Sequence, residues 1–223
     1  MVPKALIFDC DGTLLDSMDM WLSAEPKTLA AFGVETTRED FAETEHLSLP
    51  DECEVFHQRW GVGESGAEVL AKLQEIVVEA YETIVPIRPG VREFLAQAHE
   101  AGIPMAIASS TSPFMLDIAL RHHGIREYFQ NLSSTEEVAG TKADPDVFNL
   151  ALERLGLDCT PDEVWVFEDM PFGLLGAKRG GYHTVGIYDP AGRAERSVLE
   201  EESDIFIESF EELALADLEQ FEA

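Results

Sequence analysis

Residues 5–13 read ALIFDCDGT, and this stretch decides the fold. Its first four residues form an uninterrupted apolar run, which is typical of a buried strand in a parallel sheet. Two aspartates, two positions apart, follow the run directly, and Gly12 then permits a sharp turn of the chain. The pattern predicts a short buried strand that ends in a polar loop.

Similar apolar runs recur along the chain and predict further strands of the same sheet. These runs occupy residues 104–108, 164–167, 184–187 and 205–207. Helical patterns alternate with them, for example over 90–101 and 145–155, each followed by a glycine that is suited to end a helix. This alternation predicts an α/β fold with a parallel sheet, in which ligands bind at the carboxyl ends of the strands.

One long segment interrupts the alternation. Residues 17–86 contain helical patterns, such as the one over 67–84, and no convincing strand. The prolines at the end of this segment are stiff residues that suit a hinge. We therefore expect two domains: a core made of residues 1–16 and 87–223, and a helical insertion over 17–86.

The composition narrows the classes of partner. The 223 residues include 44 acidic and 15 basic side chains, so the formal net charge is −29. Such a field repels nucleic acid and anionic membranes, and neither is an expected partner. No window approaches 18 consecutive apolar residues, and the three cysteines lie too far apart for a clustered metal site. These features predict a soluble cytoplasmic protein, with a monomer favoured.

Asp9 and Asp11 are the first candidate functional residues. The pair alone carries little weight, because 144–146 shows that Asp-x-Asp arises by chance, but a preceding strand and a following Gly-Thr make the pattern specific. A calcium loop is excluded, because it would need Gly and Glu where Leu14 and Met20 stand. One carboxylate at a strand end can bind a hard cation and attack phosphorus, while the second can protonate a leaving oxygen.

Hydroxyl and ammonium groups follow other strands. Ser109, Ser110 and Thr111 precede a helix that begins at Pro113, where hydroxyls and unpaired backbone amides can hold an anion. The same pattern is also common in helix N-caps. Lys142 precedes the helical pattern at 145–155, where it is either a counter-ion for phosphate or an ordinary surface lysine.

A second carboxylate pair, Glu168 and Asp169, follows the apolar run at 164–167. Carboxylates at a strand end suit a hard, oxygen-seeking ion such as Mg²⁺. A solvated pair with no ligand is the alternative at this position.

Taken in order, these motifs resemble the haloacid dehalogenase superfamily of phosphohydrolases. The resemblance covers the whole chain, and the insertion over 17–86 is similar to the small helical cap of the β-phosphoglucomutase and phosphoglycolate phosphatase branch. It implies a Rossmann-like core with an inserted cap domain, and a hydrolase that acts on a small phosphorylated metabolite.

The resemblance also implies a role for each candidate. Asp9 would be the nucleophile that forms an aspartyl-phosphate, and Asp11 the general acid and base. Ser109, with Ser110 beside it, would bind the transferring phosphoryl group, and Lys142 would neutralise its charge.

Mg²⁺ is the cofactor that the resemblance implies. It would be held by the Asp9 carboxylate, the Asp11 backbone carbonyl and Asp169, with Glu168 acting through water. Gly12 would shape the loop around this site.

The expected function is that of a Mg²⁺-dependent phosphatase. The insertion carries few basic residues among many acidic ones, which favours a substrate with a neutral leaving group, such as a sugar or polyol phosphate. A sugar-phosphate mutase is the alternative, although the mutases carry a His where this chain has Trp21. A non-enzymatic phosphoacceptor protein is a further alternative, in which Asp11 and the insertion would have no purpose.

Overall fold

The structure is a computed structural model that describes residues 2–41, 43–44, 47–192 and 194–221. The chain divides into two compact units. The core unit comprises Met1–Asp16 and Pro86–Ala223, and the inserted unit comprises Ser17–Val85. The inserted unit thus ends at Val85, one residue before the end at residue 86 that the sequence predicts.

The core unit is built on a six-stranded sheet in which all neighbouring strands are parallel. The strand order is β3 (Phe129–Ser134), β2 (Met105–Ser109), β1 (Ala5–Phe8), β4 (Val164–Glu168), β5 (His183–Ile187) and β6 (Ile205–Ile207). This architecture confirms the predicted α/β fold with a Rossmann-like parallel sheet.

The edge strand β3 was not predicted from the sequence. Its residues, FQNLSS, contain only two apolar side chains and no continuous apolar run. An edge strand pairs with one neighbour only, which here is β2. Several polar side chains of β3 are therefore only partly buried or exposed, and they do not pay the desolvation cost of full burial. Hydrophobic periodicity therefore gives little signal for such a strand.

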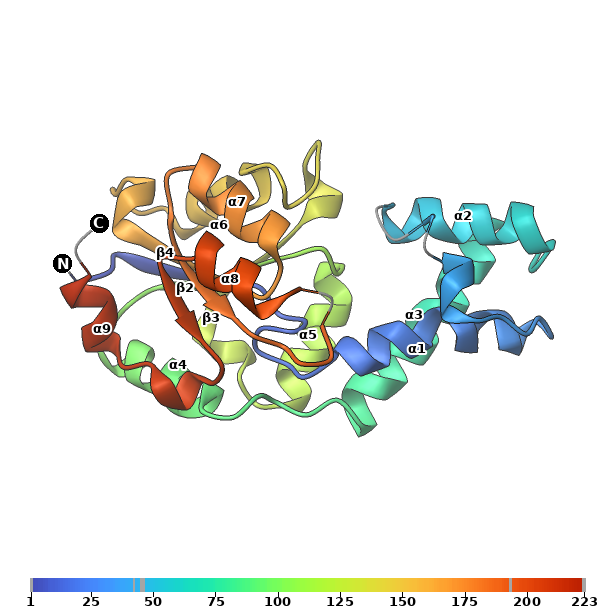
Figure 1. Ribbon diagram of the computed structural model, residues 1–223, viewed down its shortest axis with the longest axis horizontal. Helices are drawn as coiled ribbons and strands as arrows, with labels where there is room; N and C mark the ends of the chain where they lie inside the picture. The colour runs from blue at the N-terminus through green and yellow to red at the C-terminus, as the bar shows by residue number, and fades with distance from the viewer. Residues whose placement is uncertain (1, 42, 45–46, 193, 222–223) are drawn as a thin grey trace. The chain divides into compact units, whose positions relative to one another are not determined.

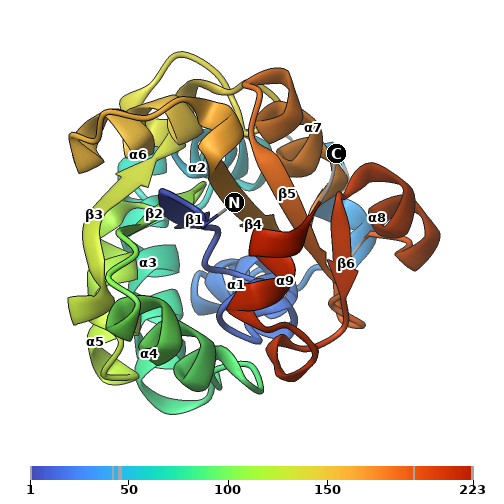
Figure 2. The same ribbon diagram turned by 90° about the vertical axis from the view of Figure 1, so that its left-hand side faces the viewer.

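Helices cover both faces of the sheet, as Figures 1 and 2 show. One face carries α4 (Val91–Glu100) and α5 (Pro113–His122), and the other carries α6 (Asp146–Leu155) and α7 (Pro171–Arg179). The chain passes from β1 outward to β3, then returns to β4 and continues to β6. Because parallel crossovers are right-handed, helices of the two halves lie on opposite faces. Two short helices, α8 (Arg196–Glu202) and α9 (Leu215–Gln220), complete the core unit.

The order in which strands are added to the sheet reverses between the parallel neighbours β1 and β4, and this point determines where a ligand can bind. Loops after these two adjacent strands lead to opposite faces, which leaves a crevice at their carboxyl ends. The DCDGT loop and the Glu168-Asp169 pair both follow strands at this point.

Apolar packing holds these strand ends in place. The ring of Phe8 stacks on that of Phe167, with centroids 4.4 Å apart, and Phe94 of α4 packs edge-on against Phe8. On the opposite face, Phe148 of α6 belongs to a buried cluster with small residues of β2, such as Ala106. Both faces of the central strands are thus buried, which explains their continuous apolar sequences.

All regular elements that the structure describes in the inserted unit are helical. It contains α1 (Met18–Ala31), α2 (Leu49–Trp60) and α3 (Gly66–Thr83). Phe56 and Trp60 of α2 pack with Phe41, with ring centroids 5.3–6.0 Å apart. Trp60 therefore contributes to the packing of this unit.

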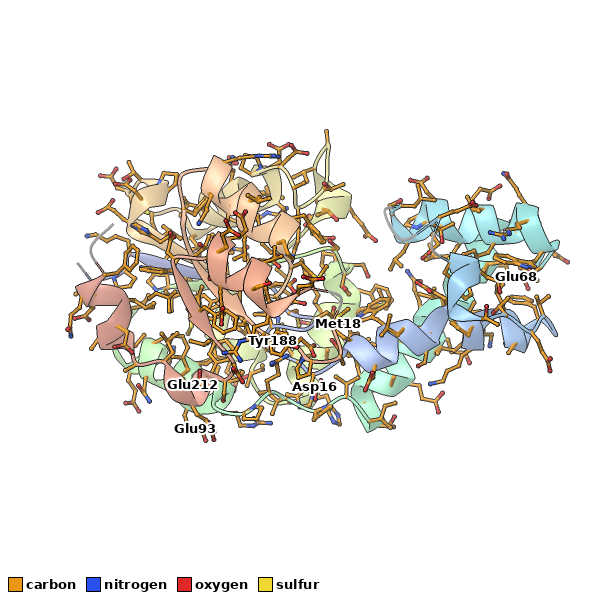
Figure 3. All side chains as sticks on the ribbon, in the orientation of Figure 1. Asp16, Met18, Glu68, Glu93, Tyr188 and Glu212 are labelled. Atoms are coloured by element: carbon orange, nitrogen blue, oxygen red, sulfur yellow. The ribbon has the colours of Figure 1, made fainter. Side chains whose placement is uncertain are left out.

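Acidic side chains are spread over both units. Glu68 of the inserted unit and Glu93 and Glu212 of the core unit are all exposed, and Figure 3 labels them. Among the described residues, no helix is both long and apolar enough to cross a membrane. The dominant surface property is therefore an excess of negative charge, which repels itself in the compact state.

We predict that salt stabilises this protein. Raising NaCl to about 1 M shortens the Debye length to about 3 Å and screens this repulsion. We expect the melting temperature to rise by several degrees, because each kcal/mol added to the free energy of unfolding raises it by about 2–4 °C in a chain of this size. Calorimetry at neutral pH tests this. The same salt increment near the sequence pI of about 4.3 is the control, because the net charge is small there; an equal shift at both pH values would contradict the charge argument.

Candidate active site

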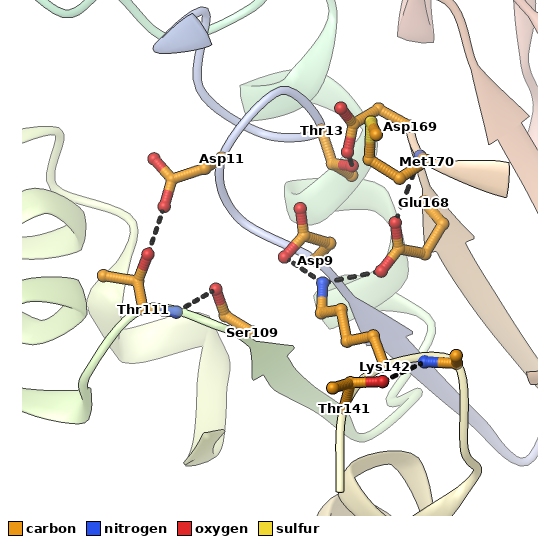
Figure 4. A network of polar contacts seen from close by, with 11 residues as sticks. Asp9, Asp11, Thr13, Ser109, Thr111, Thr141, Lys142, Glu168, Asp169 and Met170 are labelled. Atoms are coloured by element: carbon orange, nitrogen blue, oxygen red, sulfur yellow. Dashed lines mark hydrogen bonds and ion pairs between the residues drawn. The ribbon is translucent and has the colours of Figure 1, made fainter. Parts of the chain in front are cut away.

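The candidate active site lies at the carboxyl ends of the central strands (Figure 4). Asp9 directly follows β1, and the in-register pairing of β1 with β4 brings it beside the strand end that carries Glu168 and Asp169. Ser109 is the last residue of β2, the other neighbour of β1. Three strand ends thus contribute polar side chains to one place.

Lys142 joins two of the carboxylates. Its Nζ donates a hydrogen bond to Asp9 Oδ1 and another to Glu168 Oε1, the latter at 2.6 Å. All three side chains are buried, with Lys142 only 4% exposed, so it is not a surface lysine. A buried ammonium shared by two carboxylates is screened far less than a surface ion pair.

The loop that carries Lys142 approaches α7 very closely. A Cβ atom at Gly176 of α7 would lie 1.9 Å from the Lys142 carbonyl oxygen. The absence of a side chain at Gly176 is therefore what lets this loop bring the ammonium group into the site.

Asp169 is fixed by the DCDGT loop. Thr13 Oγ1 donates to Asp169 Oδ1 at 3.3 Å. Gly12 adopts a φ of +82°, and a Cβ atom there would lie 2.3 Å from Asp169 Oδ2. Both the backbone conformation and the close approach require glycine at this position. Asp169 Oδ2 is buried and has no hydrogen-bond partner among the described residues.

Burial changes the ionisation of this cluster. It raises the pKa of Asp9, an effect that the Lys142 ammonium opposes. It also raises the pKa of Glu168, to about 7, and raises that of Asp169 well above its ordinary range, with help from the neighbouring carboxylates. Burial acts to lower the pKa of Lys142, but the carboxylates of Asp9 and Glu168 outweigh it and raise that pKa. The single ammonium group of Lys142 thus does not balance the three carboxylates of the site.

The residues of the cluster fit a divalent cation. Asp9, Glu168 and Asp169 each offer one carboxylate oxygen, and these oxygens lie within 4.8 Å of one another. Three carboxylates and one ammonium give a formal charge of −2, which a single divalent ion would balance. Carboxylate oxygens are ligands that Mg²⁺ accepts, and the unpartnered Asp169 Oδ2 is a ready donor.

Asp11 lies outside this cluster. Its Oδ2 accepts a hydrogen bond of 2.7 Å from Thr111 Oγ1, and Figure 4 shows the carboxylate pointing away from Lys142. The Thr111 amide in turn donates to Ser109 Oγ at 3.1 Å. Ser109 is buried, whereas Ser110 is exposed. The contact between Thr111 and Asp11 could not be predicted from the sequence, because the two residues are 100 positions apart.

Comparisons with known proteins place the chain in a family. Residues 6–187 match the haloacid dehalogenase-like hydrolases. Hexitol phosphatase B of Escherichia coli (strain K12) is 30% identical over 218 residues, which cover 96% of each chain. The chain therefore belongs to the haloacid dehalogenase-like hydrolases, as the resemblance implied, and the expected enzyme class, a hydrolase of the phosphatase type, is confirmed at this level.

Solved structures agree with this assignment. A variant of CbbY from Rhodobacter sphaeroides, in complex with xylulose-(1,5)bisphosphate, has a TM-score of 0.81 at 27% identity, covering 95% of this chain and 96% of that one. β-Phosphoglucomutase from Clostridium difficile has a TM-score of 0.78, covering 98% and 96% of the two chains. At 17% identity this second likeness shows a shared fold alone.

We predict that Lys142→Met destabilises the protein strongly. Removal of the ammonium leaves the buried carboxylates of Asp9 and Glu168 unpaired, which costs about 3–5 kcal/mol. Urea unfolding in the presence of a chelator measures this cost. Lys178→Met is the matched control, because Lys178 is part-exposed and lies 3.7 Å from Asp204, so its loss costs less than about 1 kcal/mol. Equal losses for the two variants would show that Lys142 does not balance buried charge.

Proposed function

We propose that this protein is a Mg²⁺-dependent phosphatase that hydrolyses a small sugar or polyol phosphate through an aspartyl-phosphate on Asp9. The observation that carries the proposal is the buried Asp9 carboxylate, hydrogen-bonded to Lys142 and within 4.8 Å of an Asp169 oxygen. It lies where the two halves of the sheet meet, which is the usual ligand position in this fold class.

The first step is a phosphoryl transfer to the protein. An Asp9 carboxylate oxygen attacks phosphorus while the ester P–O bond breaks, and Asp11 gives a proton to the leaving alkoxide. The product alcohol departs and the phosphoryl group remains as an acyl phosphate on Asp9. Lys142 offsets the charge on the phosphoryl oxygens, and the Ser109 hydroxyl, with Ser110 beside it, binds them.

The second step restores the enzyme. Asp11, now ionised, accepts a proton from water as the water oxygen attacks phosphorus. The bond between phosphorus and Asp9 breaks, which releases inorganic phosphate and the free carboxylate.

The acidic cluster supports Mg²⁺ as the cofactor. The carboxylates of Asp9 and Asp169, with the Asp11 backbone carbonyl, would hold the ion, and Glu168 would add charge behind them. When bound, the ion neutralises the oxygens of the reacting phosphoryl group. The net charge of −2 supports one divalent ion.

A neutral leaving group is supported by the inserted unit. Arg59 lies 4.0 Å or less from carboxylate oxygens of Asp40 and Glu43, and Lys72 pairs with Glu75. Two of the four basic residues of this unit are thus engaged by carboxylates, which leaves these two poorly suited to a second phosphate on the substrate. The name of hexitol phosphatase B, which matches over nearly its whole length, points to the same kind of substrate.

We predict that Asp9→Asn abolishes turnover. The amide keeps the size of the side chain but removes the nucleophile, so phosphate release should fall by more than about 1,000-fold. A panel of sugar and polyol phosphates, assayed for phosphate and for isomerised sugar, gives the measurement and also distinguishes a mutase. Asp144→Asn, at an exposed Asp-x-Asp that lies outside the site, is the control. Undiminished hydrolysis by Asp9→Asn would remove Asp9 from the mechanism.

We predict that removal of divalent metal stops the reaction. Treatment with a chelator should abolish phosphate release, and excess Mg²⁺ should restore it, because the acidic cluster would otherwise repel an anionic substrate. Isothermal titration of Mg²⁺ into the chelator-treated protein gives an independent readout. Full activity without any divalent ion would contradict the cofactor assignment.

A further inference from the structure

A buried arginine outside the phosphate-binding residues connects three parts of the core unit. Arg88 is only 7% exposed. One guanidinium nitrogen donates to the Gly12 carbonyl oxygen at 2.8 Å and lies 3.3 Å from Asp189 Oδ2. The other terminal nitrogen donates to the Tyr188 carbonyl oxygen at 2.5 Å. A single side chain thus joins the DCDGT loop to the segment after β5.

The anchor for this arginine is itself well fixed. Asp189 is 3% exposed, and its Oδ1 accepts a hydrogen bond of 2.8 Å from the Ala191 amide. Tyr188 is tied to the sheet, because its amide donates to the Ile207 carbonyl at 3.0 Å. The guanidinium is therefore held from the β5 side by groups that have little freedom to move.

Arg88 also lies where the chain returns from the inserted unit. The return segment, residues 86–88, runs antiparallel to residues 14–16 and forms an isolated bridge with them. The Arg88 amide donates to the Leu14 carbonyl at 2.9 Å. The side chain of Arg88 thus holds the DCDGT loop at Gly12, and its backbone holds Leu14, the residue that follows the loop.

The Gly12 carbonyl, which accepts the hydrogen bond from Arg88, lies next to residues of the active site. It belongs to the peptide group between Gly12 and Thr13, one residue after Asp11. Thr13 donates to Asp169, and Gly12 packs against the same carboxylate. A rotation of this peptide would displace Asp11 and Thr13 together.

We propose that Arg88 is a positioning residue for phosphoryl transfer: by linking the Gly12 carbonyl to Asp189 and to the Tyr188 carbonyl, it orients the loop that carries Asp11. This inference rests on the proposed phosphatase function. Arg88 does not touch the reacting atoms, and its effect on the reaction passes through the backbone of the loop.

The guanidinium is chemically suited to this task and a lysine is not. Its planar fork donates in several fixed directions at once, whereas an ammonium group is compact and shorter in reach. Arg88→Lys therefore keeps the charge that pairs with Asp189 while losing the simultaneous contacts to two carbonyl groups. It is the variant that separates orientation from charge.

The test compares two substrates in Arg88→Lys. For a polyol phosphate, whose leaving alkoxide needs a proton, we expect kcat to fall at least about tenfold with KM within about twofold. For p-nitrophenyl phosphate, whose leaving group departs without a proton, the pre-steady-state burst of p-nitrophenolate should change by less than about threefold. A purely structural defect would slow both substrates alike.

Arg126→Lys is the matched control. Arg126 is half-buried rather than buried, but like Arg88 it binds a carbonyl, that of Phe129, and a carboxylate, that of Asp117. It lies before β3, at the end of the sheet opposite the site. Similar thermal stability in the two variants, with loss of kcat only in Arg88→Lys, supports the proposal. An unchanged kcat for the polyol phosphate in folded Arg88→Lys overturns it.

A second variant covers the case in which Arg88→Lys does not fold. Asp189→Asn removes the charge that anchors the guanidinium while keeping an oxygen for the Ala191 amide. It should show the same difference between the two substrates. Equal slowing of both would overturn the proposal.

A readout without substrate separates this inference from the proposed function. Amide hydrogen exchange of the peptide that contains residues 10–16 should quicken in Arg88→Lys and stay unchanged in Arg126→Lys. An inactive wild-type protein would end the proposed function but leave this measurement valid. Unchanged exchange in that loop would overturn the positioning role even then.

Discussion

The shared ammonium of Lys142 is the interaction on which the rest of the site depends. Asp9, Glu168 and Asp169 are buried together, and burial of three carboxylates without compensation would be prohibitive. Lys142 contributes one positive charge, which the carboxylates of Asp9 and Glu168 share. The negative charge that remains fits a divalent cation, and such a cation would in turn favour the ionised form of the carboxylates that would bind it.

The fold brings these charges together by close backbone contacts. Gly176 allows the Lys142 loop to lie against α7, and Gly12 allows the DCDGT loop to lie against Asp169. Arg88 then ties that loop to the end of β5. Strand pairing places the loops within reach of one another, and these local contacts set the final orientation of the side chains.

Much of this organisation could be predicted from the sequence. Buried strands such as β1 have continuous apolar residues because both faces of the sheet are covered, and their ends therefore identify the polar residues that meet at the site. The polar edge strand β3 lacks that signal. The contacts of Thr111 with Asp11 and of Arg88 with Gly12 join residues that are 100 and 76 positions apart, and no local pattern indicates them.

The central claim is that Asp9 becomes covalently phosphorylated during turnover. Wild-type enzyme can be mixed with substrate and Mg²⁺, quenched in acid and treated with borohydride, which reduces an aspartyl-phosphate to homoserine. Mass spectrometry of the peptide that contains residues 5–16 then locates the modified position. Homoserine at position 9, with residue 11 unmodified, is the result that this account predicts. Rapid hydrolysis with no modification at position 9, or with modification at position 11 instead, would contradict it.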